Sequence, residues 1–478
     1  MKKYALLSAL VASLFSAPAM AESPALSFQK MWTYSHAVRI PNQVSEIPAF
    51  DHRTNTLWVA GVVGVDILDA ATGAFIDHID TTAYGSINSV AIHNGLAAFA
   101  IEAKGDRRNP GKVVFYDTKT RAPSGSVSSV EVGTLPDMLT FTPDGSKLLV
   151  ANEGTPNAVA DTLYVSPDPA GSVSIIDMAT RTVTTATLAG VPLSGEGLRL
   201  NTGMDFEPEY IAVNHDGTKA FVTLQEANAI AVLDLATNAF TQVIGLGVKD
   251  FSLAENGFGG NNFIDPNHKD GRIELRPAAV KGFYQPDSIA AYDFKGETYV
   301  VMANEGDTRE DEKDKARASK LGVIGDLAEL NISTTDSTAS DLYTFGGRSF
   351  SIRDEAGELV YDSGSLLDAE AIARGIYDDG RSDDKGVEPE GVALLDIAGR
   401  TYAFIGLERT TKAAVAVFDV TNPRDVAFID MIVTDGDRAP EGLAAYRFRG
   451  NFYLAIANEV SNTTTLYSLE RKEPGSVK

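Results

Sequence analysis

Residues 136–154 read Pro-Asp-Met-Leu-Thr-Phe-Thr-Pro-Asp-Gly-Ser-Lys-Leu-Leu-Val-Ala-Asn-Glu-Gly, and this stretch decides the fold. Two short apolar runs flank a Thr-Pro-Asp-Gly turn at 142–145, which is the pattern of a β-hairpin. One acid, Asp137, stands at the start of the hairpin, and a second, Glu153, follows its end. Because the same arrangement returns along the chain, we expect a repeated strand–turn–strand unit.

Seven such units can be aligned. They begin near residues 45, 88, 136, 208, 286, 389 and 440. A third apolar run follows in several units and ends on an aspartate before a polar turn, as in Asp177-Met178-Ala179-Thr180. Strand-rich repeats of roughly 40–50 residues are typical of β-propellers, in which each repeat forms one blade of about four strands. The sequence therefore predicts an all-β, seven-bladed β-propeller.

The two ends of the repeat array predict how the ring closes. Residues 27–34 form an extra strand before the first unit, and the last unit shows only three strands, the third at 465–469. Pairing Met31–Tyr34 with this last strand would complete the blade and remove an exposed sheet edge. The units are also unequally spaced, which predicts insertions. We expect them at about 155–170, 240–284, 306–340 and 346–385.

The first 21 residues are predicted to be a secretory signal peptide, with Lys2-Lys3, an apolar stretch and Ala19-Met20-Ala21 as the cleavage site. Residues 22–478 then form a single propeller domain. No later run reaches the roughly 18 apolar residues of a membrane span. We therefore expect an exported protein, periplasmic or secreted, and a monomer.

The composition limits the chemistry. The chain has no cysteine, six histidines and a formal net charge of −24. It therefore lacks disulfides and thiolate metal sites, and it repels nucleic acid. Oxygen-ligand cations such as calcium are favoured, although the charge also has a simpler explanation in solubility.

The repeated acids form five pairs, whose members are 16, 17, 18, 18 and 18 residues apart. In chain order they are Asp137/Glu153, Glu209/Glu226, Asp287/Glu305, Glu390/Glu408 and Glu441/Glu459. Since equivalent positions of propeller blades converge on the channel, we expect all ten at one channel mouth. Crowded carboxylates raise one another's pKa or require a cation, and calcium takes about 6–8 oxygen ligands. The alternative is that these acids cap turns and stabilise blade edges.

Longer strings carry a family resemblance. They include residues 135–139 (Leu-Pro-Asp-Met-Leu), 284–292 (Tyr-Gln-Pro-Asp-Ser-Ile-Ala-Ala-Tyr), 345–352 (Phe-Gly-Gly-Arg-Ser-Phe-Ser-Ile), 388–392 (Glu-Pro-Glu-Gly-Val) and 404–409 (Phe-Ile-Gly-Leu-Glu-Arg). Together they resemble the choice-of-anchor I domain family of exported bacterial β-propellers, over about residues 40–470. That family is similar to a mesenchyme-specific cell surface glycoprotein, and some members carry alkaline-phosphatase or phytase-like labels.

An acidic loop in this family often reads DxxDKDG, and residues 265–271 here read Asp-Pro-Asn-His-Lys-Asp-Gly. Glu274 follows Gly271 too closely for an EF-hand, which leaves calcium binding at this loop open.

Two arginines complete the predicted site. Arg409 follows Glu408 directly, and Arg348 lies in the Gly-Gly-Arg-Ser-Phe string. A guanidinium beside bound calcium suits a phosphate, although each arginine is also suited to a plain ion pair with a neighbouring glutamate. The prediction is a calcium-dependent hydrolase acting on a small phosphorylated substrate. Two alternatives stay open, namely a non-enzymatic propeller that binds an extracellular protein or glycan with structural calcium, and a lactonase-type ester hydrolase.

Overall fold

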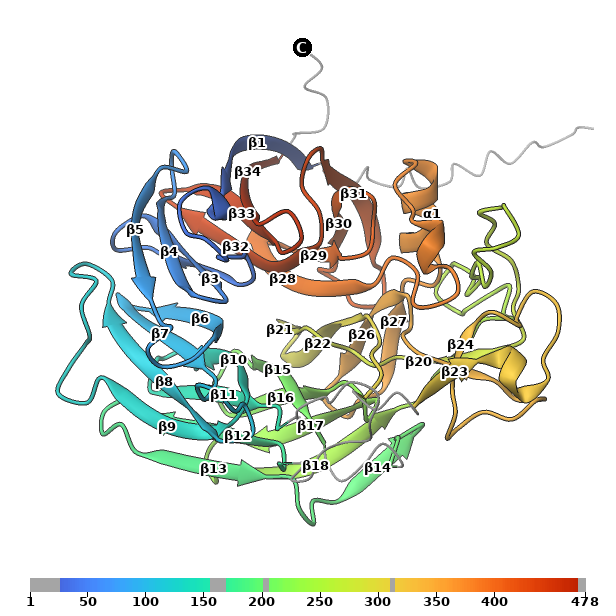
Figure 1. Cartoon of the computed structure of the whole chain (residues 1–478), viewed down its shortest axis with the longest axis horizontal. Helices are drawn as coiled ribbons and strands as arrows, with labels where there is room; N and C mark the ends of the chain where they lie inside the picture. Colours follow the sequence, from blue (N-terminus) through green and yellow to red (C-terminus); the bar gives the residue numbers. More distant parts are fainter. Residues whose placement is uncertain (1–25, 155–168, 201–205, 310–313, 472–478) are drawn as a thin grey trace, which may run out of the picture.

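The fold is a ring of β-sheets. The computed structural model describes residues 26–154, 169–200, 206–309 and 314–471. In these residues there are six four-stranded sheets and one five-stranded sheet of blade size, besides two smaller sheets. The first strand of each contacts the first strand of the next, and β32 contacts β2, so the sheets enclose a central channel (Figure 1). The β-propeller predicted from the sequence is confirmed.

Each blade-sized sheet is built outward from the channel. The first strands are β2 (Pro48–Asp51), β6 (Ile87–His93), β10 (Pro136–Phe141), β15 (Pro208–Val213), β21 (Ile289–Phe294), β28 (Pro389–Ile397) and β32 (Pro440–Phe448). The second strands are β3 (Thr56–Gly61), β7 (Leu96–Ile101), β11 (Lys147–Asn152), β16 (Lys219–Leu224), β22 (Glu297–Asn304), β29 (Arg400–Leu407) and β33 (Asn451–Asn458). The third strands are β4 (Gly64–Asp69), β8 (Pro110–Asp117), β12 (Ser172–Asp177), β17 (Ala229–Asp234), β26 (Ser349–Asp354), β30 (Ala413–Asp419) and β34 (Thr463–Arg471). The outer strands are β5 (Phe75–Asp80), β9 (Ser129–Thr134), β13 (Val183–Thr187), β18 (Ala239–Leu246), β27 (Leu359–Asp362), β31 (Ala427–Thr434) and β1 (Leu26–Ser35). A fifth strand, β14 (Leu193–Glu196), runs parallel to β18.

The middle strands are mostly apolar and buried because both faces of each sheet pack against a neighbouring sheet. Every residue of β3 is buried, for example. Between two sheets, the rings of Phe350 on β26 and Phe418 on β30 lie 4.4 Å apart. This packing holds the blades rigidly around the channel.

The aspartates that end four of the third strands stabilise turns. We call Asp69, Asp117, Asp177 and Asp234 the turn aspartates. The carboxylate of Asp177, for example, accepts hydrogen bonds from the backbone N–H groups of Ala179 (3.0 Å) and Thr180 (2.8 Å). The other three repeat this geometry, which is that of an Asx turn.

The ring closes as predicted. Strand β1 pairs antiparallel with β34, with Trp32 opposite Leu466 and Tyr34 opposite Thr464. The N-terminal strand thereby supplies the outer strand of the sheet that holds the last repeat.

The insertions differ in part from the prediction. Residues 349–362, which we placed inside an insertion at 346–385, form β26 and β27, the outer half of a blade. The error arose because a long excursion, 305–348, separates β22 from its neighbour β26, so that the third strand comes late in the sequence. The insertion expected at 240–284 starts only after β18, and the one at 155–170 lies largely outside the described residues.

Two excursions pack together beside the ring. They contain β19 (Val248–Asp250), β20 (Lys281–Phe283), β23 (Lys315–Arg317), β24 (Asn331–Ser333), β25 (Tyr343–Thr344) and the 3-10 turn η2 (Ala318–Leu321). Their side chains share a small apolar core that includes Phe251, Val280 and Ile332. A third excursion, after β27, holds helix α1 (Leu366–Ala373) and the 3-10 turn η3 (Asp379–Arg381). Figure 1 shows α1 and the β20–β23–β24 region on one side of the ring.

Candidate functional site

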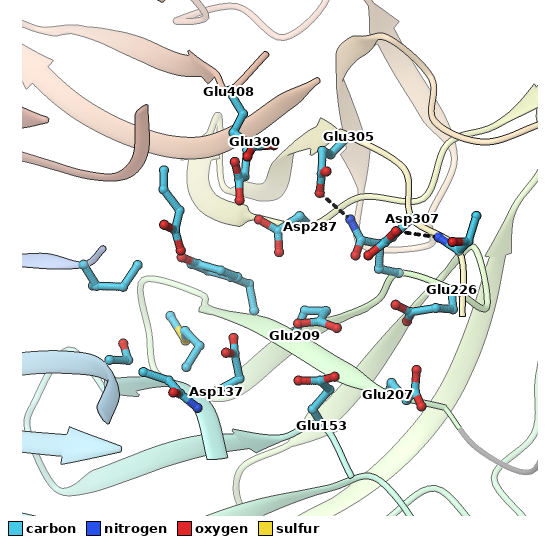
Figure 2. A pocket seen from close by; sticks show the side chains of 18 of the residues that line it. Asp137, Glu153, Glu207, Glu209, Glu226, Asp287, Glu305, Asp307, Glu390 and Glu408 are labelled. Atoms are coloured by element: carbon cyan, nitrogen blue, oxygen red, sulfur yellow. Dashed lines mark hydrogen bonds between the residues drawn. The ribbon is translucent and has the colours of Figure 1, made fainter. Parts of the chain in front are cut away.

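A cavity of about 310 Å³ lies where the channel meets the starts of the first strands and the ends of the second strands. Eleven carboxylates of the described part of the chain line it, and we call them the rim carboxylates. They are Asp137, Glu153, Glu207, Glu209, Glu226, Asp287, Glu305, Asp307, Glu390, Glu408 and Glu441. Arg409 is the one basic residue among the described residues that line the cavity. Figure 2 shows acids from several sheets surrounding a common space.

A repeated backbone distortion precedes the first acid of four pairs. Leu135, Gln285, Glu388 and Ala439 each stand directly before a proline and have φ of 46°, 46°, 51° and 57°. Proline disfavours helical conformations in the residue before it, so positive φ here is costly, at roughly 1–3 kcal/mol per residue.

The pairing register also shifts in the first strand at the acid. In β10 the shift falls between Pro136 and Leu139, and β28 shifts between Pro389 and Val392. A bulge re-aims side chains, so this strained start places Asp137 and Glu390 at the channel mouth.

In three pairs the second acid forms a backbone hydrogen bond with the positive-φ residue that precedes the first acid. The backbone N–H of Glu153 donates to the carbonyl of Leu135 at 2.9 Å, and that of Glu408 donates to the carbonyl of Glu388 at 2.9 Å. Glu459 repeats this bond to Ala439 at 2.8 Å. The nearly constant spacing in the sequence thus corresponds to one local structure.

The electrostatics of the cavity follow from crowding. Burial, and after it neighbouring carboxylates, raises the pKa of Glu209, Asp287, Glu390 and Glu441 well above the usual value. For Glu209 the neighbours are led by Glu153, and for Glu390 by Glu408.

Three further acids show smaller shifts. Burial raises the pKa of Asp137 to about 6, although Arg107 acts against it. Burial and Asp307 raise the pKa of Glu226 to about 7, and burial and Glu305 raise that of Glu408 to about 8. Without a cation, the site therefore holds protons near neutral pH.

Two buried carboxylate oxygens at the cavity, Oε2 of Glu226 and Oε2 of Glu390, have no hydrogen-bond partner among the residues that the structure describes. Glu226 is only 7% exposed, and Figure 2 shows it among the acids of the cavity. One oxygen each from Asp287, Glu305 and Glu390 lies within 4.8 Å of the others. Buried carboxylates with open lone pairs, in an all-oxygen donor set, fit a hard cation such as calcium.

A second, smaller cavity of about 180 Å³ adjoins the acidic one. The two cavities share Met138, Tyr210 and Glu441, and the second is also lined by Leu139, Val392 and Leu443.

Most of the predicted acids come together. Nine of the ten line the cavity, and Glu459 lies outside its lining but close enough to Glu441 to raise the pKa of that residue further, behind burial and Glu46. The sequence-based prediction missed Glu46, Glu207, Asp307 and Glu388. A signal was present for two of them, since Glu207-Pro208-Glu209 and Glu388-Pro389-Glu390 have the same letters.

The two predicted arginines differ. Arg409 lines the cavity, is 42% exposed in its side chain and contacts Glu408 Oε1 at 2.7 Å. Arg348 is 1% exposed and donates to the carbonyls of Ser382 (2.7 Å) and Asp384 (2.9 Å). Burial keeps Arg348 from any ligand of the cavity, so its predicted contact with phosphate is wrong.

The acidic loop at 265–271 is occupied by the protein's own cation. Arg276 contacts Asp265 Oδ1 at 3.4 Å and Asp270 Oδ2 at 2.9 Å. The backbone N–H of Glu274 donates to the other oxygen of Asp265 at 2.9 Å. These contacts satisfy the acids that an EF-hand would direct at calcium.

The fold and the site define the class of protein, which is a β-propeller with a carboxylate-lined channel mouth. Comparison with known proteins identifies the family. The family model of the choice-of-anchor I domain matches residues 46–423, and the chain belongs to that family. A curated relative, Gigasin-3a from Magallana gigas, is 32% identical over 114 residues, which cover 20% of this chain and 40% of that protein. The chain thus spans about two fifths of the length of this relative.

The solved structure of hydrazine synthase supports the fold alone. Hydrazine synthase of Kuenenia stuttgartiensis matches with a TM-score of 0.51 at 12% identity, over 92% of this chain and 99% of that one. The β-propeller domain of Cps50 (Swd1) from Myceliophteria thermophila matches with a TM-score of 0.47 at 9% identity, with the same coverage. In the described residues, no helix is long and apolar enough to cross a membrane.

Proposed function

We propose that the rim carboxylates bind calcium and that the loaded site hydrolyses phosphate esters. The observation that supports the proposal is the convergence of eleven carboxylates on one cavity, two of them with buried, unbonded oxygens. Such a charge density is tolerated only with protons or cations, and an exported protein meets calcium readily. The signal peptide at 1–21 lies outside the described residues, so export to the periplasm or the medium remains part of this proposal.

Asp287 and Glu390 are the first candidates to hold a cation, because one oxygen of each lies within 4.8 Å of the other. Bound calcium would supply a Lewis acid that neutralises the phosphate oxygens and lowers the pKa of a water molecule. Arg409 would orient the phosphate, since its guanidinium is half-exposed at the cavity.

The test is hydrolysis of p-nitrophenyl phosphate by the purified protein with calcium, with chelator, and with calcium restored. We expect turnover that chelator abolishes and calcium restores. Arg409→Gln should lower kcat/KM about tenfold or more. Arg272→Gln, an exposed arginine of the 265–274 loop, is the control and should leave the rate unchanged. No turnover under any condition overturns the hydrolase.

A second candidate is a propeller that binds a partner and uses calcium for stability alone. It is favoured by the lining itself. Among the described lining residues there is no histidine, cysteine or lysine, and the one arginine is already engaged by Glu408. Calcium would then raise the melting temperature without any turnover, which the same assay and a thermal melt separate.

A further inference from the structure

A cation lies beside one side of the acidic cavity, behind its lining residues, and it is the ammonium group of Lys385, which contacts the lining residue Glu305. Its Nζ lies 2.8 Å from Glu305 Oε1, 2.9 Å from Glu388 Oε2 and 2.5 Å from the carbonyl oxygen of Gly306. Lys385 is 9% exposed. All three donor positions of the ammonium are thus filled by oxygens, two of which are carboxylate.

These oxygens are the kind that a metal ion would take. One oxygen each from Glu305, Glu388 and Glu408 lies within 4.8 Å of the others. Glu388 and Glu408 also form ion pairs with arginines. Arg381 contacts Glu388 Oε1 at 2.5 Å, and Arg409 contacts Glu408 Oε1 at 2.7 Å.

Other acids of the cavity lack such a contact. For Asp287 and Glu390, no ion pair with a basic residue occurs in the described parts of the chain, and Oε2 of Glu390 has no hydrogen-bond partner. Glu226 shows the same open oxygen on another side of the cavity. The cavity is therefore divided into a side neutralised by Lys385 and the two arginines and a side that is not.

The segment that carries Lys385 is held from behind by Arg348. The guanidinium of Arg348 binds the carbonyls of Ser382 and Asp384, immediately before Lys385. Asp368 on α1 accepts the backbone N–H of Val387 at 3.3 Å. Gly386 has φ of 69°, and a Cβ there would lie 3.0 Å from Arg348 and Asp368. Arg348 is thus a positioning residue that acts through Lys385.

We propose that Lys385 is a built-in cation, which fills one cation position of the cavity and so confines divalent ions to the side with Asp287, Glu390 and Glu226. The inference rests on the proposed binding of calcium. It predicts that the ion count of the site is set by an insertion that lies outside the repeat.

The test is isothermal titration of calcium chloride into the wild type, Lys385→Met and Lys385→Arg. Methionine keeps the length of the side chain and removes the charge, so Lys385→Met should bind one further calcium ion per chain, or bind calcium at least about tenfold more tightly. Lys385→Arg keeps the charge and should match the wild type. The double variant Lys385→Met/Glu388→Gln should lose the gain, because it removes a ligand of the new position.

Thermal melts distinguish a change in calcium binding from a folding defect of the variant. In chelator, Lys385→Met should melt lower than the wild type, because Glu305 and Glu388 lose their partner. Calcium should then raise its melting temperature by about 3 °C more than it raises that of the wild type. If the wild type binds calcium and Lys385→Met binds it with the same stoichiometry and affinity, the proposed role of Lys385 is overturned. A wild type that does not bind calcium overturns the proposed function instead, and a gain of binding in Lys385→Met would still support the built-in cation.

Discussion

The turn aspartates and the rim carboxylates come from the same repeat, yet they meet opposite environments. A turn aspartate such as Asp177 is exposed, and the backbone N–H of Thr180 holds its pKa below the usual value. A rim acid such as Glu390 is surrounded by Glu408 and other acids, and burial and these neighbours raise its pKa. Repetition in the sequence alone therefore does not distinguish structural acids from site acids. The group that contacts each carboxylate distinguishes them, because an N–H donor stabilises the charge of a carboxylate and another carboxylate destabilises it.

The largest expected effect is on the pH dependence of stability. The rim acids have raised pKa values in the folded state, about 6 for Asp137, 7 for Glu226 and 8 for Glu408. The folded protein then binds more protons than the unfolded chain between about pH 4.5 and 8, so the stability of the metal-free protein falls as pH rises through this window.

We expect the melting temperature in chelator to be at least about 5 °C lower at pH 8 than at pH 5, and calcium to remove most of the difference. Melting curves at both pH values, with chelator and with calcium, measure this. A metal-free protein that is more stable at pH 8 would mean that the rim acids behave like the turn aspartates.

The next effect is on calcium affinity. Glu390→Gln and Glu441→Gln each remove a charged ligand while keeping the shape of the side chain. Each should weaken calcium binding about tenfold or more by isothermal titration. Asp177→Asn is the matched control, because it neutralises a repeated acid of the turns. Unchanged affinity in both glutamine variants would assign the rim to the scaffold.

A smaller effect is on the free energy of unfolding, which neutralising a rim carboxylate should raise and neutralising a turn aspartate should lower. In chelator at pH 8, Glu226→Gln should stabilise the protein by about 1 kcal/mol. The reason is that burial and Asp307 raise the pKa of the Glu226 carboxyl group to about 7, so its negative charge at pH 8 is unfavourable in the folded state. Chemical denaturation with chelator present tests this. A destabilised Glu226→Gln variant would show that its carboxylate has a stabilising partner.

The smallest effect belongs to the turn. Asp177→Asn keeps an oxygen for the N–H groups of Ala179 and Thr180 but loses the charge that strengthens those bonds. We expect a fall in melting temperature of no more than about 2 °C, equal with and without calcium. A calcium-dependent change in this variant would break the contrast between the two sets of acids.

The repeat pattern of the amino-acid sequence was enough to predict the ring and most of the acids that meet at its mouth. The Pro-acid start of five repeats and the acid 16–18 residues later are local signals, because a bulged strand and a backbone bond such as that of Glu153 to Leu135 join them within a single blade. Equivalent positions of a closed propeller must converge, so Asp137 and Glu441 could be placed together across about 300 residues of chain.

The ion pairs of these acids, in contrast, are visible only in the folded chain. Arg348 has a site-like sequence context but is buried behind the cavity, whereas Lys385 stands in an insertion with no repeat and reaches Glu305 and Glu388. Contacts of this kind depend on how excursions fold back over the ring, and no local periodicity encodes that path. The electrostatics of the site are set by those long-range contacts, since a carboxylate's pKa depends on the groups within a few ångströms of it rather than on its neighbours in the sequence.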